Sequence, residues 1–220
     1  MSSAGPDPRR ASKRGAVTAS AALEVLAAQA ARILARPLAA AELESFEKYL
    51  SLLTRWQRVH RLVGSVDPGW VVEHLFLDSL LFLSVLPENL RSLADLGSGA
   101  GFPGIPIKIV RPALEVTLIE SRQRRASFLS TVVRELGLEG VRVDAGRAED
   151  SIGARPFEAV AMRCAGDREE LIATGRALVT PGGLVVVSGP PERRSLDWGR
   201  WVEVEGVRPG SRRLFAVHSM

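Results

Sequence analysis

Residues 95–106 read DLGSGAGFPGIP, a glycine-rich stretch directly after a short apolar run that ends at Leu96. Glycine carries no Cβ, so the main chain at Gly97, Gly99 and Gly101 can approach a bound ligand closely. In an α/β protein, a turn of this kind leads from a strand into a helix and places the helix N-terminus at the same crevice. The stretch therefore predicts a loop that cradles a nucleotide-like ligand at the end of a parallel strand.

From Leu93 onward, short apolar runs alternate with helical stretches, which is typical of a parallel sheet covered by helices. We expect strands at residues 92–96, 115–119, 141–144, 157–162, 184–188 and 214–217. Helices are expected between them, notably at 121–136 and 168–178. The turn formed by Pro181, Gly182 and Gly183 begins a late edge strand, and residues 190–210 are expected to be mainly loop. The fold class is α/β.

The part of the chain before residue 91 has a helical pattern throughout. Residues 1–18 are rich in small, polar and basic residues and predict a disordered basic tail. Apolar residues then recur at helical spacing over 19–36, from about residue 40 to Trp56, and over 70–86. We therefore divide the chain into a tail (1–18), a helical N-terminal segment (19–90) and an α/β domain (91–220).

The composition sets limits on the class of protein. The 220 residues are 46% hydrophobic, enough for one principal domain, and the net charge of +4 is compatible with an anionic partner such as RNA. Cys164 is the one cysteine, which excludes an internal disulfide and a multi-cysteine metal site. No secretory signal or membrane-spanning run is found. We expect a cytoplasmic, monomeric protein without a metal or a membrane partner.

The glycines alone do not identify the ligand, because residues 99–104 also satisfy the dinucleotide pattern G-x-G-x-x-G. Pro103 and Pro106 delay the start of the helix, which disfavours a pyrophosphate at its N-terminus. Glu120 ends the second strand, where its carboxylate can accept both hydroxyl hydrogens of a ribose, as in NAD enzymes. Ala148 and Glu149 follow the third strand, where methyltransferases recognise adenine, and so they favour S-adenosylmethionine.

Several stretches of the chain carry a resemblance to one known family. They are residues 95–106, HLFLDSL at 74–80, LIES at 118–121, ELGL at 135–138 and RAE at 147–149. Together they closely resemble the bacterial 16S ribosomal RNA guanine-N7 methyltransferases, also called glucose-inhibited division protein B. The resemblance covers about residues 52–163, and more loosely the helical segment and the final strands.

The resemblance implies a Rossmann-like class I S-adenosylmethionine-dependent methyltransferase with a helical N-terminal segment. Its implied activity is methylation of guanine N7 in the 16S RNA of the small ribosomal subunit. Its implied cofactor contacts lie at Gly97, Phe102, Ala148, Glu149 and Arg163, to which the strand position adds Glu120. The side chain of Phe102 has an alternative place in the protein core.

The chain departs from this family at three places. WQRVHRLVG at 56–64 stands where the family has Trp-Asn leading to Asn-Leu-Thr, MRCA at 162–165 replaces Ser-Arg-Ala, and Ser188-Gly189 replaces Lys-Gly. These changes leave two alternatives open. One is a methyltransferase acting on a different RNA, a protein or a small molecule, and the other is a non-catalytic protein that binds the cofactor or RNA.

Guanine N7 carries an in-plane lone pair and needs no deprotonation before it attacks a methyl group. Catalysis is then expected to come from proximity and orientation, with no catalytic residue, and Cys164 is interpreted as a structural thiol. Asp95 is expected near a cationic end of the ligand, and His74 and Asp78, one helical turn apart, are expected to form a polar brace.

The deep, narrow major groove of an A-form helix hides N7, so the target guanine is expected in an unpaired region. Basic residues are expected near the RNA phosphates, and they are Arg122, Arg124, Arg125, Arg193, Arg194, Arg212 and Arg213.

Overall fold

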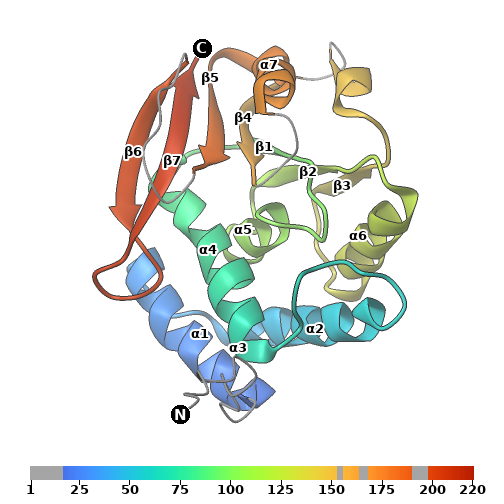
Figure 1. Ribbon diagram of the computed structural model, residues 1–220, viewed down its shortest axis with the longest axis vertical. Coiled ribbons are helices and arrows are strands. Elements are labelled where there is room, and N and C mark those ends of the chain that lie inside the picture. Colours follow the sequence, from blue (N-terminus) through green and yellow to red (C-terminus); the bar gives the residue numbers. More distant parts are fainter. Residues whose placement is uncertain (1–16, 153–155, 164–167, 190–197) are drawn as a thin grey trace, which may run out of the picture.

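A computed structural model describes residues 17–152, 156–163, 168–189 and 198–220 of the chain. Its centre is a seven-stranded sheet with the order β3-β2-β1-β4-β5-β7-β6 (Figure 1). The strands are β1 (Ser92–Leu96), β2 (Glu115–Ile119), β3 (Val141–Asp144), β4 (Phe157–Met162), β5 (Val179–Ser188), β6 (Arg200–Glu205) and β7 (Arg212–Ser219). Strands β1 to β5 run parallel, whereas β7 is antiparallel to both β5 and β6.

The first four predicted strands are confirmed with the expected bounds. The segment 190–210 was expected to be loop-rich, and this expectation missed β6, which occupies Arg200–Glu205 in the part that the structure describes. The side chains of this segment are too exposed to give a strand pattern in the sequence. Its main chain forms a strand by hydrogen bonding to β7. The late strand β5 was expected at an edge, but it lies between β4 and β7.

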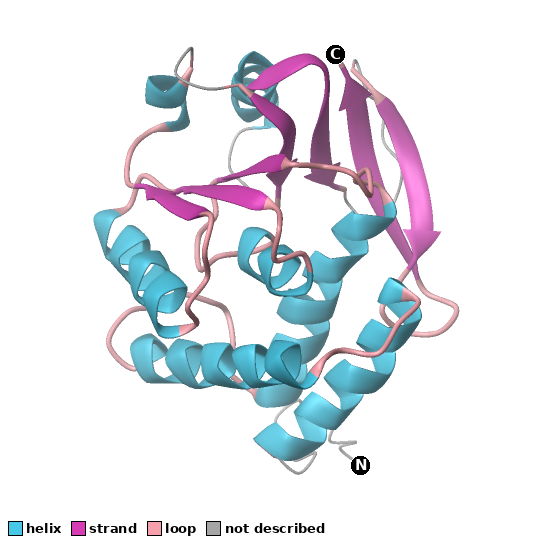
Figure 2. Ribbon diagram, turned by 180° about the vertical axis from the view of Figure 1, so that it is seen from behind, coloured by secondary structure: helices cyan, strands magenta, loops and turns pink. Residues whose placement is uncertain are grey.

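Helices cover the two faces of the sheet unequally. They are α1 (Ala19–Leu34), α2 (Ala40–Gln57), α3 (Pro68–Val71), η2 (Val72–Leu77), α4 (Asp78–Leu80), η3 (Leu81–Ser84), α5 (Gly104–Val110), α6 (Gln123–Glu135), η4 (Ala148–Ser151) and α7 (Arg168–Leu178). The elements from α1 to α6 gather on one side of the sheet and α7 lies on the other (Figures 1 and 2). Strand residues alternate accordingly, so that Leu93 belongs to the larger core and Ala94 to the smaller one.

The N-terminal helices begin where local capping groups occur. The Thr18 hydroxyl accepts from the Ala21 N–H at 3.2 Å, and the Glu42 carboxylate accepts from the Ala39 N–H at 2.8 Å. The helix predicted over 70–86 begins earlier, at Pro68, where Asp67 caps it, and contains the π-helix η2. A π-helical turn of this kind often occurs at a functional site.

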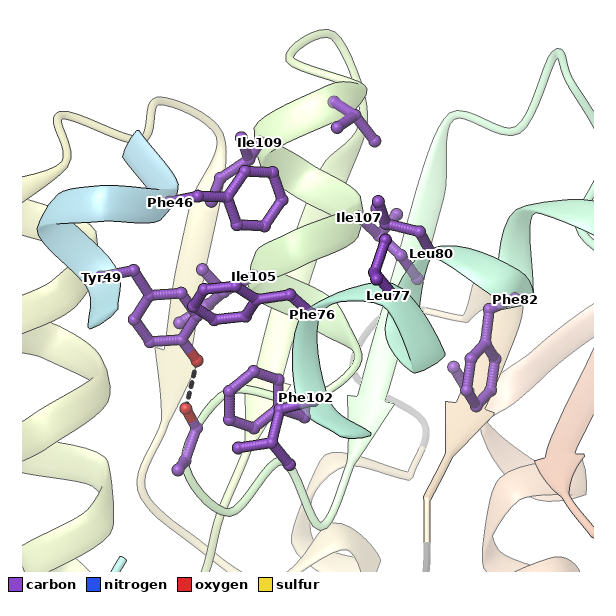
Figure 3. Packing of buried hydrophobic residues seen from close by; sticks show 14 of the residues in the cluster. Phe46, Tyr49, Phe76, Leu77, Leu80, Phe82, Phe102, Ile105, Ile107 and Ile109 are labelled. Atoms are coloured by element: carbon purple, nitrogen blue, oxygen red, sulfur yellow. Dashed lines mark hydrogen bonds between the residues drawn. The ribbon is translucent and has the colours of Figure 1, made fainter. Parts of the chain in front are cut away.

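Aromatic side chains join the N-terminal helices to the glycine-rich loop. Tyr49 of α2 stacks against both Phe76 and Phe102, with ring centroids 5.3 and 5.4 Å away, and Phe76 lies 6.1 Å from Phe102 and 5.0 Å from Phe46 (Figure 3). The Tyr49 hydroxyl donates a short hydrogen bond to the Ala100 carbonyl, drawn as the dashed line in Figure 3. The helical segment therefore supports the loop from inside the core.

We expect Tyr49→Phe to lower the free energy of unfolding by about 1–3 kcal/mol, because the buried Ala100 carbonyl loses its hydroxyl donor. Urea unfolding measures this change. Thr54→Val is the matched control, since Thr54 donates to the Leu50 carbonyl within α2, where the helix supplies that oxygen with another donor. Its effect should stay below about 0.5 kcal/mol. Equal losses in the two variants would contradict the role given to Tyr49.

Candidate functional site

The loop between β1 and α5 lies at the carboxyl ends of the parallel strands. Its first two main-chain N–H groups, of Gly97 and Ser98, both donate to the Ile119 carbonyl of β2 at 3.0 Å. Gly97 has a φ of 71° and is exposed, whereas Ser98 is buried. The first glycine of the loop thus presents its main chain outward at the sheet edge, where the sequence predicted a ligand.

The other two glycines of the loop have different surroundings. Gly101 has a φ of 97°, and a Cβ there would collide with Ile105 and lie 2.6 Å from the Tyr49 hydroxyl. Gly99 has a φ of 62°, and a Cβ there would meet only the Gly97 carbonyl oxygen at 3.8 Å and an Arg125 nitrogen at 3.9 Å. The core therefore requires glycine at 101, while the space beside Gly99 is open.

Asp95 ties the two ends of the loop together. Its Oδ2 accepts from the Ser98 hydroxyl at 2.7 Å and from the Gly104 N–H at 2.9 Å. The side chain is fully buried, and Oδ1 has no hydrogen-bond partner. Burial raises the pKa of this carboxyl to about 6, although both hydrogen bonds and the charge of Arg163 oppose the increase. Asp95 thus organises the loop, and its expected contact with a cationic ligand stays a prediction.

Stability should depend on pH through Asp95. Because the folded protein raises this pKa from 3.8 to about 6, the folded state holds the proton more tightly, and stability falls as the pH rises through about 6. Asn at position 95 cannot titrate, so Asp95→Asn serves as the reference. The difference in unfolding free energy, natural protein minus variant, should decrease by up to about 3 kcal/mol between about pH 4 and pH 7. Chemical unfolding at each pH measures this difference, and a flat difference would contradict the raised pKa.

Glu120 follows β2 and contacts the glycine-rich loop directly. Its Oε2 accepts from the Gly99 N–H at 2.9 Å and its Oε1 from the Arg122 N–H at 2.8 Å, while an Arg125 nitrogen lies 3.8 Å from Oε2. The side chain is 6% exposed. Each carboxylate oxygen has further acceptor capacity, so Glu120 can hold the loop and still accept from a ligand hydroxyl.

Ala148 and Glu149 begin the short helix η4, which follows β3 at the same end of the sheet. Ala148 is buried in the smaller core, whereas Glu149 is exposed. Glu149 accepts from the Thr174 hydroxyl of α7 at 3.4 Å. The structure therefore places an exposed carboxylate beside a buried alanine after the carboxyl end of β3.

Arg163 follows β4, and its guanidinium is held on several sides. One nitrogen donates to the His74 carbonyl at 2.7 Å, Nε lies 3.5 Å from Asp78 Oδ2, and the guanidinium lies over the Phe102 ring, 5.7 Å from its centroid. The side chain is 15% exposed, and Nη1 is buried without a hydrogen-bond partner among the described residues. A fixed arginine with a spare buried donor fits an anionic or polar ligand group.

The structure places the Phe102 side chain in the core and pairs Asp78 with two arginines instead of His74. The Phe102 ring packs against Tyr49 in the core, so the alternative core role describes its side chain. Asp78 does not brace His74 but pairs with Arg163 and with Arg213, whose Nε lies 3.0 Å from Oδ1. The π-helix and β7 bring these groups together. Cys164 lies outside the described residues.

Sequence reasoning missed Tyr49 and the pairing of Arg213 with Asp78 as parts of this site. The spacing of α2 indicated that Tyr49 faces the core, but no local signal showed that its hydroxyl reaches the loop. Among the described residues, no three His, Cys, Asp or Glu side chains are grouped closely enough to hold a metal. None of the described helices has the length and apolar character needed to cross a membrane.

The fold is that of the class I S-adenosylmethionine-dependent methyltransferases. It is similar to the solved structure of the O-methyltransferase TomG from Streptomyces achromogenes, with a TM-score of 0.52 and 20% identity, covering 79% of this chain and 88% of that chain. A family model described as rRNA small subunit methyltransferase G matches residues 42–189, from α2 to the end of β5.

Curated relatives agree with the family model. The ribosomal RNA small subunit methyltransferase G of Xylella fastidiosa (strain 9a5c) is 40% identical over 164 residues, which are 73% of this chain and 76% of that protein. The protein of the same name from Sorangium cellulosum (strain So ce56) is 41% identical over 173 residues, 75% of this chain and 72% of that protein. The chain belongs to the rRNA small subunit methyltransferase G family.

Proposed function

We propose that this protein transfers a methyl group from S-adenosylmethionine to N7 of a guanine in 16S RNA of the small ribosomal subunit. The observation that carries the proposal is that the loop 97–104, Glu120, Glu149 and Arg163 all follow the carboxyl ends of the parallel strands β1 to β4. Family membership supports RNA as the acceptor. We also propose that the protein acts in the cytoplasm as a monomer and uses no metal.

The residues present fit the cofactor. The space beside Gly99 is open, and Arg163 Nη1 is a buried donor without a partner. We assign Glu120 to the ribose hydroxyls and Ala148 with Glu149 to the adenine. Gly97 and Phe102 complete the contacts that the resemblance implies, with the main chain of the exposed Gly97 facing outward.

When bound, S-adenosylmethionine supplies an electrophilic methyl group on its sulfonium sulfur. That group would pass to the lone pair of guanine N7, with the S–C bonding electrons left on sulfur, while Glu120, Glu149 and Arg163 would hold the cofactor. No proton leaves N7, so the protein supplies no general base. The chain's own contribution is to hold the reactants in line, which is worth about 7 kcal/mol or more in favourable cases.

Nucleoside analysis tests the proposed reaction. The protein is incubated with methyl-labelled S-adenosylmethionine and small-subunit RNA that lacks the modification, both as free RNA and in assembled subunits. We expect labelled 7-methylguanosine at a single position. Label in a different nucleoside, a different RNA, a protein or a small molecule would reject the proposed acceptor. Cofactor binding without transfer to any fraction would indicate a non-catalytic binding protein.

Glu149 and Asp150 provide a matched pair for testing cofactor recognition, since both are exposed acidic residues of η4. We expect Glu149→Ala to weaken S-adenosylmethionine binding roughly ten- to a hundredfold, the effect of losing a hydrogen bond to a charged group. Asp150→Ala should change the affinity less than about twofold. Isothermal titration calorimetry measures both dissociation constants, and equal effects of the two substitutions would contradict the assignment of Glu149 to adenine.

A further inference from the structure

The chain between α2 and α3 forms a small projection that one side chain closes. Gln57, the last residue of α2, donates from Nε2 to the Val63 carbonyl at 2.8 Å, and its Oε1 accepts from the N–H groups of Leu62 and Val63 at 2.7 and 3.1 Å. Trp56 adds a ring contact with His60, at 5.4 Å between centroids. Residues 58–61, which we call the tip, are therefore held in one conformation between these anchors.

The tip presents an unusual set of side chains to solvent. Val59 is 78% exposed, more than any other exposed large hydrophobic residue of the described chain. Arg58 and Arg61 on either side of it are exposed, and within the described residues neither lies at ion-pair distance from a carboxylate. A fixed loop that holds an apolar side chain between two unpaired cations in water suits a partner that is both anionic and partly apolar.

The tip is connected to α6 through Trp56. The Trp56 ring contacts His60 of the tip and also Phe128 of α6, with 5.4 Å between centroids in each case. Arg124 precedes Phe128 by four residues, so it lies one helical turn away on the same helix face. The loop that follows α2 passes beside α6 in Figure 1 as well. Trp56 thus connects the tip to the helix that carries Arg122 and Arg124 at its start.

The start of α6 carries positive charge, which is unfavourable at a helix N-terminus. Arg122 is the N-cap residue, Arg124 and Arg125 lie in the first turn, and no acidic residue accompanies them there. Cations are disfavoured at a helix N-terminus, where the helix dipole is positive. Arg125 is near Glu120, but Arg122 and Arg124 are exposed and unpaired within the described part of the chain. These arginines thus reduce the stability of the first turn of α6, and an anionic partner would offset this loss.

Other arginines expected near RNA are already neutralised. Arg212 lies 3.1 Å from Glu203, and Arg213 lies 3.0 Å from Asp78. Arg208 lies 2.6 Å from Glu73 and lines, with Arg212 and Arg213, a cavity of about 230 Å³. Arg193 and Arg194 lie outside the described residues. Within the described chain, unpaired positive charge therefore favours the tip and α6 over this cavity as the place where RNA phosphates bind.

We propose that the tip, together with Arg122 and Arg124, docks the phosphate backbone of the substrate RNA beside the target guanine. Val59 packs against a sugar or base of the same strand. The surface adjoins the cofactor loop, because Arg125 connects α6 to Glu120 and Gly99. This inference rests on the proposed function in taking RNA as the acceptor. It assigns a role to a segment that departs from the family pattern.

The test measures the salt dependence of binding to in vitro transcribed small-subunit RNA. Each phosphate neutralised contributes about 0.7–0.9 to the slope of log affinity against log salt concentration. The double variants Arg58→Ala/Arg61→Ala and Arg122→Ala/Arg124→Ala should each reduce the slope by about 1.4–1.8. Their lysine counterparts should keep most of the slope. S-adenosylmethionine affinity should stay within about twofold of the natural protein.

The control is Arg176→Ala/Arg200→Ala, which removes two exposed arginines of α7 and β6 and the same charge. Its slope should not change. Unchanged slopes in both tip and α6 variants, or an equal loss in the control, would overturn the docking surface. Methyl transfer to RNA is measured in parallel. Transfer with unchanged slopes refutes this surface alone, whereas absent transfer with reduced slopes refutes the proposed reaction and leaves the surface supported.

Discussion

The buried carboxylate of Asp95 is the constraint on which the rest of the site depends. By accepting from the Ser98 hydroxyl and the Gly104 N–H, one oxygen closes the loop onto the start of α5. A buried, unpaired carboxylate destabilises the folded state, and hydrogen bonds and a raised pKa limit this destabilisation. The loop is thus positioned by groups beneath it, and Gly97 stays exposed at the carboxyl end of β1.

The helical N-terminal segment takes part in the site. Tyr49 supports the loop through the Ala100 carbonyl, and the π-helix provides the His74 carbonyl that fixes Arg163. Asp78, just after the π-helix, pairs with Arg163 and Arg213 and so links the ends of β4 and β7. Removing this segment would take away the His74 carbonyl and the Asp78 carboxylate that hold the Arg163 guanidinium.

Much of the α/β core could be predicted because its signals are local. Strands β1 to β4 were expected at their observed bounds, since each is a compact apolar run flanked by turn residues. The strand β6 was missed because half of its surface is exposed and its stability comes from β7. Glu120 was expected to face a ligand, but its bond to the Gly99 N–H, which makes it also part of the loop's support, had no signal in the sequence.

The sequence alone determined strands β1 to β4, the glycine-rich loop and the chemistry of its ligand, because alternation, helical spacing and the conformational freedom of glycine act over a few residues. Tertiary structure decided which groups complete the site. Arg163 meets the His74 carbonyl across 89 residues, and Arg213 meets Asp78 across 135. Such pairs form only when strands and helices have packed, since a hydrogen bond depends on distance in space and no short-range pattern records it.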